Sequence, residues 1–338
     1  MKHRLKLGLA AGLVAGLALV GCASNAAPGG EGKGDSADGA HSIGFFGFSA
    51  ANSFAQAVYT GVEEAASDAG AKSTFVDGQF DGQLQAQQIN DAITSKQFDV
   101  IIIQANDNLA VQEPLKKAVD AGITVVVEFA PVGPKFDTAE PQVEGAISIV
   151  DPPVENGKTL GELGLLACEE VGPNCKVAYM EGNPALPLDN SRTEAVLATL
   201  KTGTGVEALP TVKGGYSADE GRSAFQDIIQ ANPDVNVVIG SSQAVAGAAL
   251  AAGPDSKIKF IGNGTPQSGV EKVLNGEWFA VYLLDSVGNG RKAAELGLAH
   301  ANGETVETAT LETSLSPNGG KGTKQALEES KFVSGYDE

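Results

Sequence analysis

The sequence predicts an α/β fold in which parallel sheets are flanked by helices, and three observations lead to it. Short apolar or β-branched runs alternate with helical patterns from Ser42 onward. Val100–Ile103 is apolar on both faces, which is typical of a parallel strand buried between two layers of helices. The alternation begins again after Asp151-Pro152-Pro153, which breaks regular structure. The chain is therefore expected to form two similar lobes.

Each predicted strand is a short apolar or β-branched run, and each predicted helix repeats apolar residues at helical spacing. The strands are expected over 42–48, 72–76, 100–104, 124–128, 146–150, 176–181, 206–212, 236–240, 257–262, 279–284 and 308–314. The helices are expected over 54–69, 84–95, 110–121, 154–171, 190–201, 218–231, 244–251, 268–275 and 288–301. Ligands of open α/β sheets bind at the carboxyl ends of the strands, so we expect a cleft where the lobes face each other.

Residues 1–22 are typical of an export signal that ends in a lipidated cysteine. Three basic residues precede the apolar run 7–20, which is too short and too rich in glycine for a stable membrane span. Leu19-Val20-Gly21-Cys22 resembles the bacterial lipobox, which implies a diacylglycerol on Cys22. An ordinary secretory signal with an incidental cysteine is the alternative. Residues 23–41 are mostly Gly, Ala, Ser, Asp and Pro, and they predict a flexible tether.

The net charge bears on possible binding partners, and the cysteine content bears on disulfide bonding. The chain has 42 acidic and 23 basic residues and a net charge of −19, so nucleic acid is an unfavourable partner. With Cys22 assigned to the lipid, Cys168 and Cys175 remain, and two cysteines of an exported protein commonly pair. We expect a structural disulfide between them. A redox pair or a pair of metal ligands is the alternative, but it lacks a Cys-x-x-Cys spacing and a nearby histidine.

No catalytic set is recognisable. The three histidines, His3, His41 and His300, belong to no nucleophile–base arrangement and are too few for a His-rich metal site. Gly288-Asn289-Gly290 fits a dinucleotide-binding motif only loosely, and a plain helix start explains it more simply. We therefore predict a protein that is not an enzyme and has no cofactor and no metal. An oxidoreductase that uses the cleft, and a transcription regulator with similar lobes, are the rival classes.

Four stretches, in the correct order, resemble the periplasmic sugar-binding proteins of the ribose/galactose type, the receptors of ABC importers. They are 51–54, 103–108, 232–238 and 261–266, and the similarity extends over 42–315. The resemblance implies the type 1 periplasmic-binding-protein fold, with two Rossmann-like lobes and a hinge of three chain crossings. The lobes are expected over 42–150 plus 286–310 and over 151–285 plus 311–330.

The resemblance also implies ligand contacts, position by position. Asn52 falls where the family hydrogen-bonds its ligand, and Phe54 falls where it stacks an aromatic ring on it. Arg192 falls on a ligand-gripping arginine, whose planar donors suit vicinal hydroxyls or a carboxylate. The full implied set is Asn52, Phe54, Glu128, Phe129, Asn190, Arg192, Tyr216, Ser242, Asn263 and Asp285.

Several of these positions depart from the family pattern. The family commonly has an Asp-Arg pair after its fourth strand, where this chain has Phe129-Ala130, although Glu128 would stand in if the register slips by one residue. Ser242 replaces a usual Asn, and Asn263 replaces a usual Asp. Near the last crossing Leu284 replaces a Gln and is followed by Asp285. A less polar pocket than that of a hexose receptor is expected.

The predicted function is an exported solute-binding protein of an ABC transporter, lipid-anchored on the outer face of the cell membrane. It is expected to be a monomer that captures a sugar, a polyol or a related ring compound by hinge closure and then docks on a membrane permease. The alternative is a ligand-sensing receptor of the same fold that feeds a chemotaxis or two-component system.

Overall fold

The computed structural model describes residues 40–337. The predicted signal, Cys22 and nearly all of the predicted tether lie outside the described residues. Regular structure starts with β1 (Ser42–Gly47), at the first residue of the predicted strand. Within the described range no helix combines the length and the apolar content needed to cross a bilayer.

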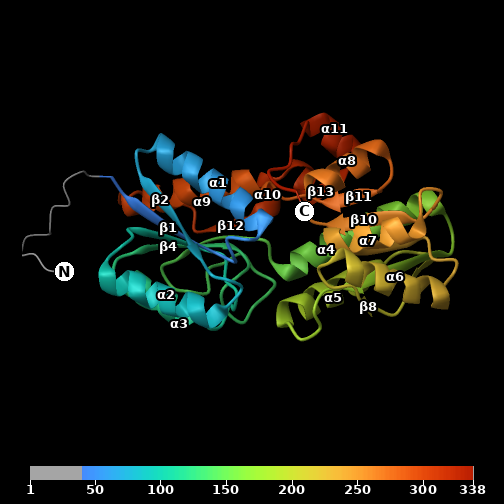
Figure 1. Ribbon diagram of the computed structural model, residues 1–338, viewed down its shortest axis with the longest axis horizontal. Coiled ribbons are helices and arrows are strands. Elements are labelled where there is room, and N and C mark those ends of the chain that lie inside the picture. The colour runs from blue at the N-terminus through green and yellow to red at the C-terminus, as the bar shows by residue number, and fades with distance from the viewer. Residues whose placement is uncertain (1–39, 338) are drawn as a thin grey trace, which may run out of the picture. The chain divides into compact units, whose positions relative to one another are not determined.

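The first sheet is parallel throughout and has the strand order β12-β5-β4-β3-β1-β2 (Figure 1). Its central strands are fully buried because helices cover both faces, as the apolar runs predicted. The remaining strands are β2 (Lys72–Asp77), β3 (Val100–Ile103), β4 (Thr124–Phe129), β5 (Ile147–Val150) and β12 (Ala309–Leu311).

Side chains of the first sheet alternate between two cores. One core joins Ile102 and Val126 to α1 (Ser53–Asp68) and α9 (Ser286–Ala301). The other joins Ile101 and Val125 to α2 (Gly82–Ser95) and α3 (Gln112–Asp120) on the opposite face. Figure 1 shows these two helix pairs on opposite sides of the sheet. We call each sheet with its covering helices a lobe.

The second sheet has the order β13-β11-β10-β9-β6-β7, with the short β8 paired to β6. The sheet is parallel, as predicted, except at its edge, where the unpredicted β13 runs antiparallel to β11. The expected strand 206–212 is split in two, because Pro210 lacks a backbone N–H. The strands are β6 (Cys175–Glu181), β7 (Val206–Ala208), β8 (Val212–Lys213), β9 (Val237–Ser241), β10 (Lys259–Asn263), β11 (Ala280–Tyr282) and β13 (Lys321–Thr323).

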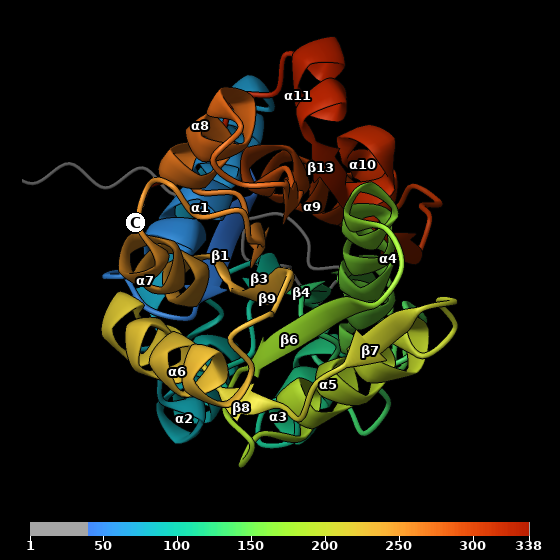
Figure 2. The same ribbon diagram turned by 90° about the vertical axis from the view of Figure 1, so that its right-hand side faces the viewer.

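Helices also cover both faces of the second sheet, as Figure 2 shows from the end of the molecule. α4 (Pro153–Val171) and α5 (Pro187–Leu200) pack on one face. α6 (Ala218–Ala231), α7 (Ser242–Ala252) and α8 (Gln267–Asn275) pack on the other. The C-terminal part adds α10 (Glu312–Leu315), the 3-10 turn Pro317–Gly320 and α11 (Lys324–Ser330).

The chain passes between the sheets three times: between β5 and α4, between β11 and α9, and between β12 and α10. These passages lie at Val150–Asp151, Leu284–Asp285 and Leu311, where crossings were expected. Each lobe is therefore built from segments that are distant in sequence. The predicted lobe boundaries and a hinge motion about these crossings remain predictions.

Glycines permit the close approach of α1 and α9. A Cβ atom on Gly290 would lie 1.9 Å from the carbonyl oxygen of Val58, and one on Gly61 would lie 1.9 Å from that of Val287. Neither position has room for a side chain. Gly290 therefore serves helix packing, which gives the loose dinucleotide motif a structural explanation.

Candidate functional site

Aromatic side chains gather at the carboxyl ends of β1 and β4. The ring centroids of Phe54 and Phe129 are 5.0 Å apart, and those of Phe48 and Phe129 are 5.9 Å apart, both in edge-to-face geometry. All three side chains are only partly buried. We call Phe48, Phe54 and Phe129 the first-lobe aromatic cluster. It presents an apolar surface where the family pattern has a charged pair.

Phe129 has an unusual backbone. Its φ is +67°, in the left-handed region that phenylalanine rarely adopts. Two hydrogen bonds hold this conformation: the Phe129 N–H donates to Oε1 of Glu312 at 3.1 Å, and the Asp151 N–H donates to the Phe129 carbonyl at 2.7 Å. Strain of this kind persists where the surroundings enforce it, often at ligand sites.

Glu128 and Glu312 form a buried acidic pair behind this cluster. Neither side chain has exposed surface. Burial raises the pKa of Glu128 to about 7, and hydrogen bonding with Glu312 and Gln104 lowers it in part. Burial and the charge of Glu128 raise the pKa of Glu312 well above its usual range. Phe129, not Glu128, therefore belongs to the candidate ligand surface.

In the second lobe, Arg192 on α5 lies in a compact polar cluster. Its Nη1 donates to Oδ1 of Asp189 at 2.7 Å and to the Tyr216 hydroxyl at 3.2 Å. The Tyr216 hydroxyl in turn donates to Asp189 at 2.6 Å. Tyr216 is 47% exposed as a residue, although its hydroxyl is hydrogen-bonded to Arg192 and Asp189, and burial raises its pKa to about 12. Arg192 is 7% exposed, and its Nε has no partner among the described residues.

A second polar group joins two crossings of the chain. The Tyr282 hydroxyl donates to Oδ1 of Asp151, and Asn156 donates to Oδ2 of Asp151 at 2.9 Å. Asn156 also donates to Oδ1 of Asn263 at 3.1 Å. Burial raises the pKa of Asp151 to about 6, while the Tyr282 hydrogen bond and the charge of Arg192 lower it in part. The group links the end of β11 to the start of α4 and to β10.

Four other predicted residues have structural partners of their own. Asn52 caps α1, because its side chain accepts from the Ala55 N–H at 2.8 Å. Asp285 caps α9 by accepting from the Gly288 N–H at 3.0 Å. Ser242 is buried at the start of α7. Asn190 is exposed and donates to the Pro184 carbonyl at 3.1 Å. The structure brings Arg192 and Tyr216 together, and it places Asn190 outside their cluster.

Sequence reasoning missed several members of these groups. The sequence pattern makes Phe48 the last residue of a strand and Asp151 part of a break in regular structure, so neither stands out as a site residue. Asp189 precedes Arg192 by three residues, a spacing that places both side chains on the same face of a helix. This spacing could have indicated their ion pair. Tyr282 lies 131 residues from its partner Asp151, and no local pattern indicates that pairing.

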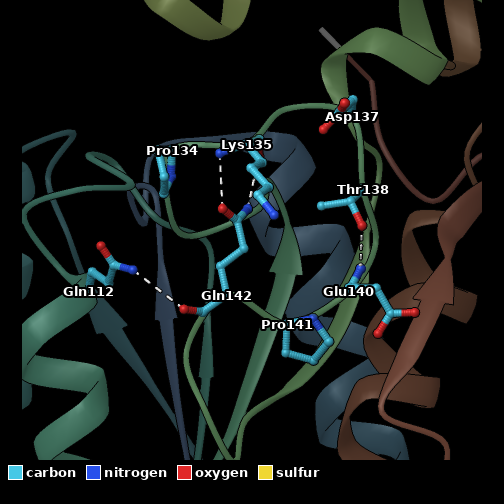
Figure 3. A pocket seen from close by; sticks show the side chains of 8 residues that line it. All are labelled: Gln112, Pro134, Lys135, Asp137, Thr138, Glu140, Pro141 and Gln142. Atoms are coloured by element: carbon cyan, nitrogen blue, oxygen red, sulfur yellow. Dashed lines mark hydrogen bonds between the residues drawn. The ribbon is translucent and has the colours of Figure 1, made fainter.

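A surface hollow of about 790 Å³ lies on the loop between β4 and β5, apart from these groups. Gln142 organises the loop: the Lys135 N–H donates to its Oε1 at 2.9 Å, and its Nε2 donates to the Lys135 carbonyl at 2.8 Å (Figure 3). The lining contains none of the residues for which ligand contact was predicted. The hollow therefore adds nothing to the candidate site.

The two cysteines of the described residues are adjacent in space. Cys168 near the end of α4 and Cys175 at the start of β6 have their Sγ atoms 2.04 Å apart, within bonding distance. Both side chains are buried in the second-lobe core. Their geometry is that of a disulfide between a helix end and the following strand.

Comparison with known proteins identifies the class. Residues 43–305 match the family model of the periplasmic binding protein domain. The chain therefore belongs to this family, and the family is one of binding domains rather than enzymes. The type 1 fold that the sequence predicted is confirmed.

The individual proteins to which the chain is similar share only low sequence identity with it. The chain is 22% identical over 203 residues to the ribose import binding protein of Bacillus subtilis, and the match covers 60% of this chain and 61% of that relative. A solute-binding protein of Actinobacillus succinogenes with bound D-allose has a TM-score of 0.73 and 18% identity, with 86% of this chain and 99% of that one covered. One from Bacillus halodurans with bound myo-inositol has a TM-score of 0.71 and 19% identity, with 87% and 99% covered. One from Agrobacterium vitis with bound D-fucose has a TM-score of 0.71 and 20% identity, with the same coverage.

Proposed function

We propose that the chain is the solute-binding protein of an ABC importer and that it binds a sugar, a polyol or a related ring compound between its lobes. The observation that carries the proposal is the contrast between the two candidate surfaces. The first lobe offers the partly exposed rings of Phe54 and Phe129, and the second offers the donors of Arg192 and Tyr216. Such rings pack on C–H faces of a sugar, while a guanidinium hydrogen-bonds its hydroxyls.

Hinge closure follows from the division of the site. A ligand that contacts both lobes stabilises the closed state by the difference between its affinities for the closed and open states. The three crossings are short, so a rotation there changes few backbone torsions. The full proposed ligand set keeps the implied positions Asn52, Phe54, Phe129, Arg192, Tyr216, Ser242, Asn263 and Asp285.

The location and partners belong to the same proposal. A diacylglycerol on Cys22 would hold the protein at the outer face of the membrane, beside a permease that receives the closed, liganded form. Its sequence support is the basic, apolar and small-residue order of residues 1–22. We expect Cys22→Ala to move the protein from the membrane fraction to the soluble fraction. A variant that stays in the membrane fraction would refute lipid anchoring.

A thermal-shift experiment tests the ligand class. The full chain in mild detergent is titrated with D-allose, myo-inositol, D-fucose and glycerol, the ligands named for similar structures. A bound ligand at about 100 times its Kd should add about 2.7 kcal/mol to the unfolding free energy. Arg192→Lys, which keeps the charge but loses the fork of donors, should reduce the shift, and Arg222→Lys on the exposed side of α6 should not. No shift with any of the four compounds would refute this ligand class.

A further inference from the structure

The C-terminal segment Val333–Asp337 is fixed to the second lobe. The Ser334 hydroxyl donates to the Thr265 carbonyl, and the Thr265 N–H donates to the Tyr336 hydroxyl at 3.0 Å. The Gln267 N–H donates to the Tyr336 carbonyl at 2.8 Å. Tyr336 is only 8% exposed. The segment therefore moves with the loop that follows β10.

The same segment reaches the first lobe. The rings of Tyr336 and Phe54 lie 5.8 Å apart in edge-to-face geometry. A Cβ atom on Gly335 would lie 2.5 Å from Cγ2 of Val287 and 3.5 Å from Cβ of Ala57, so the segment passes closely beside α9 and α1. Tyr336 thus extends the first-lobe aromatic cluster from the opposite lobe.

The Tyr336 hydroxyl also borders proposed ligand positions of the second lobe. A Cβ atom on Gly264 would lie 3.2 Å from this hydroxyl and 3.1 Å from Oγ of Ser242. Gly264 directly follows Asn263, another proposed ligand residue. The small residues Ser242 and Gly264 leave room for the phenol. Tyr336 therefore stands between the proposed ligand surfaces of the two lobes.

We propose that Tyr336 is a ligand-contact residue that the C-terminal segment adds to the cleft, and that it favours ligands with a more apolar ring. The inference rests on the proposed function. Polar contacts hold Tyr336 to the second lobe, while its contact with Phe54 is made by the ring alone. Closure brings such a ring against the edge of a bound sugar. A phenyl or phenol ring packs well on C–H groups and poorly on a desolvated hydroxyl.

D-fucose and D-galactose are the probes, because D-fucose has a methyl group where D-galactose has a hydroxymethyl group. Binding to the full chain is measured by isothermal titration calorimetry. The wild type should bind D-fucose about tenfold more tightly than D-galactose. Tyr336→Ala should weaken D-fucose binding by about tenfold and reduce the preference to about twofold or less. Tyr336→Phe should keep the preference, since it keeps the ring.

Matched variants control for folding. Val333→Ala changes an 81% exposed residue of the same segment and should leave both affinities unchanged. The unfolding free energy of each variant is measured without sugar. If Tyr336→Ala does not fold, Tyr336→Leu replaces it, because leucine retains apolar volume without an aromatic ring.

The outcomes separate this inference from the proposed function. If D-fucose binds equally to wild type and Tyr336→Ala, Tyr336 is not a contact residue, while the proposed function stands. Tighter binding to the variant also overturns the inference, because the ring would then occupy the site rather than line it. If myo-inositol or D-allose binds but D-fucose does not, only the preference for an apolar ring fails. If none of these sugars and polyols binds, both proposals fail.

Discussion

Replacing Glu128 by Gln should stabilise the protein at neutral and alkaline pH and have little effect near pH 4. Glu128 is fully buried, and burial is the main cause that raises its pKa from an ordinary 4.5 to about 7. Glu312 faces it, and burial together with the charge of Glu128 raises the pKa of Glu312 well above its usual range, so ionising Glu128 beside it is costly. A glutamine side chain at this position has nearly the same size and shape as glutamate and cannot ionise.

The size of the effect follows from linkage. The folded protein holds the Glu128 proton more tightly than the unfolded chain, so the associated stability is complete below about pH 4.5 and is lost as the pH rises through about 7. A rise in pKa from 4.5 to about 7 corresponds to about 3 kcal/mol. Glu128→Gln should therefore exceed the wild type by up to about 3 kcal/mol near pH 8.

Urea unfolding followed by circular dichroism at about pH 5, 6, 7 and 8 measures this difference. Glu295→Gln, an exposed position on α9, is the matched control and should change the unfolding free energy equally at every pH. The reasoning is refuted if Glu128→Gln differs from the wild type by the same amount at all pH values. It is refuted equally if the variant is less stable than the wild type near pH 8.

Four further predictions concern the site and its support. Arg192→Ala should lower the unfolding free energy by about 3 kcal/mol, because the buried Asp189 loses its cation, whereas Arg222→Ala should change it by less than about 0.5 kcal/mol in the same urea titration. Phe129→Gly should be about 1 kcal/mol more stable than Phe129→Ala, because glycine accepts a φ of +67°; equal stability would argue against strain. Gly290→Ala should cost about 2 kcal/mol or more, and an unchanged Tm would contradict the packing argument. Under denaturing conditions, thiol titration should detect neither Cys168 nor Cys175, and the double Ser variant should lose about 2 kcal/mol; two reactive thiols would contradict the disulfide.

The fold was predictable because its strongest signals are local. Val100–Ile103 is fully buried between helices, as its apolar pattern required. β13 was not predictable in the same way: Lys321-Gly322-Thr323 has no apolar residue, and only its pairing with β11 makes it a strand. Its stability comes from a neighbour in space rather than from its own sequence.

The site was predictable only where one segment carries the chemistry. The family pattern indicated Phe54 and Arg192, and both lie in the groups that the structure assembles. The alternative roles of Glu128 and Phe129 depended on a register shift of one residue, which reverses the direction of a strand side chain. Tyr336 comes from a short tail without apolar periodicity, so its contact with Phe54, far away in sequence, could not be inferred.

The strained residue Phe129 connects the candidate ligand surface to the chain crossings. Its N–H is held by Glu312 directly after β12, and its carbonyl accepts from Asp151 directly after β5. Residues at two of the three chain crossings therefore hydrogen-bond to the backbone of Phe129, whose ring packs against Phe54. A rotation at either crossing must alter these hydrogen bonds or carry Phe129 with it. Binding at the ring, as proposed, would therefore be coupled to any rotation at these two crossings.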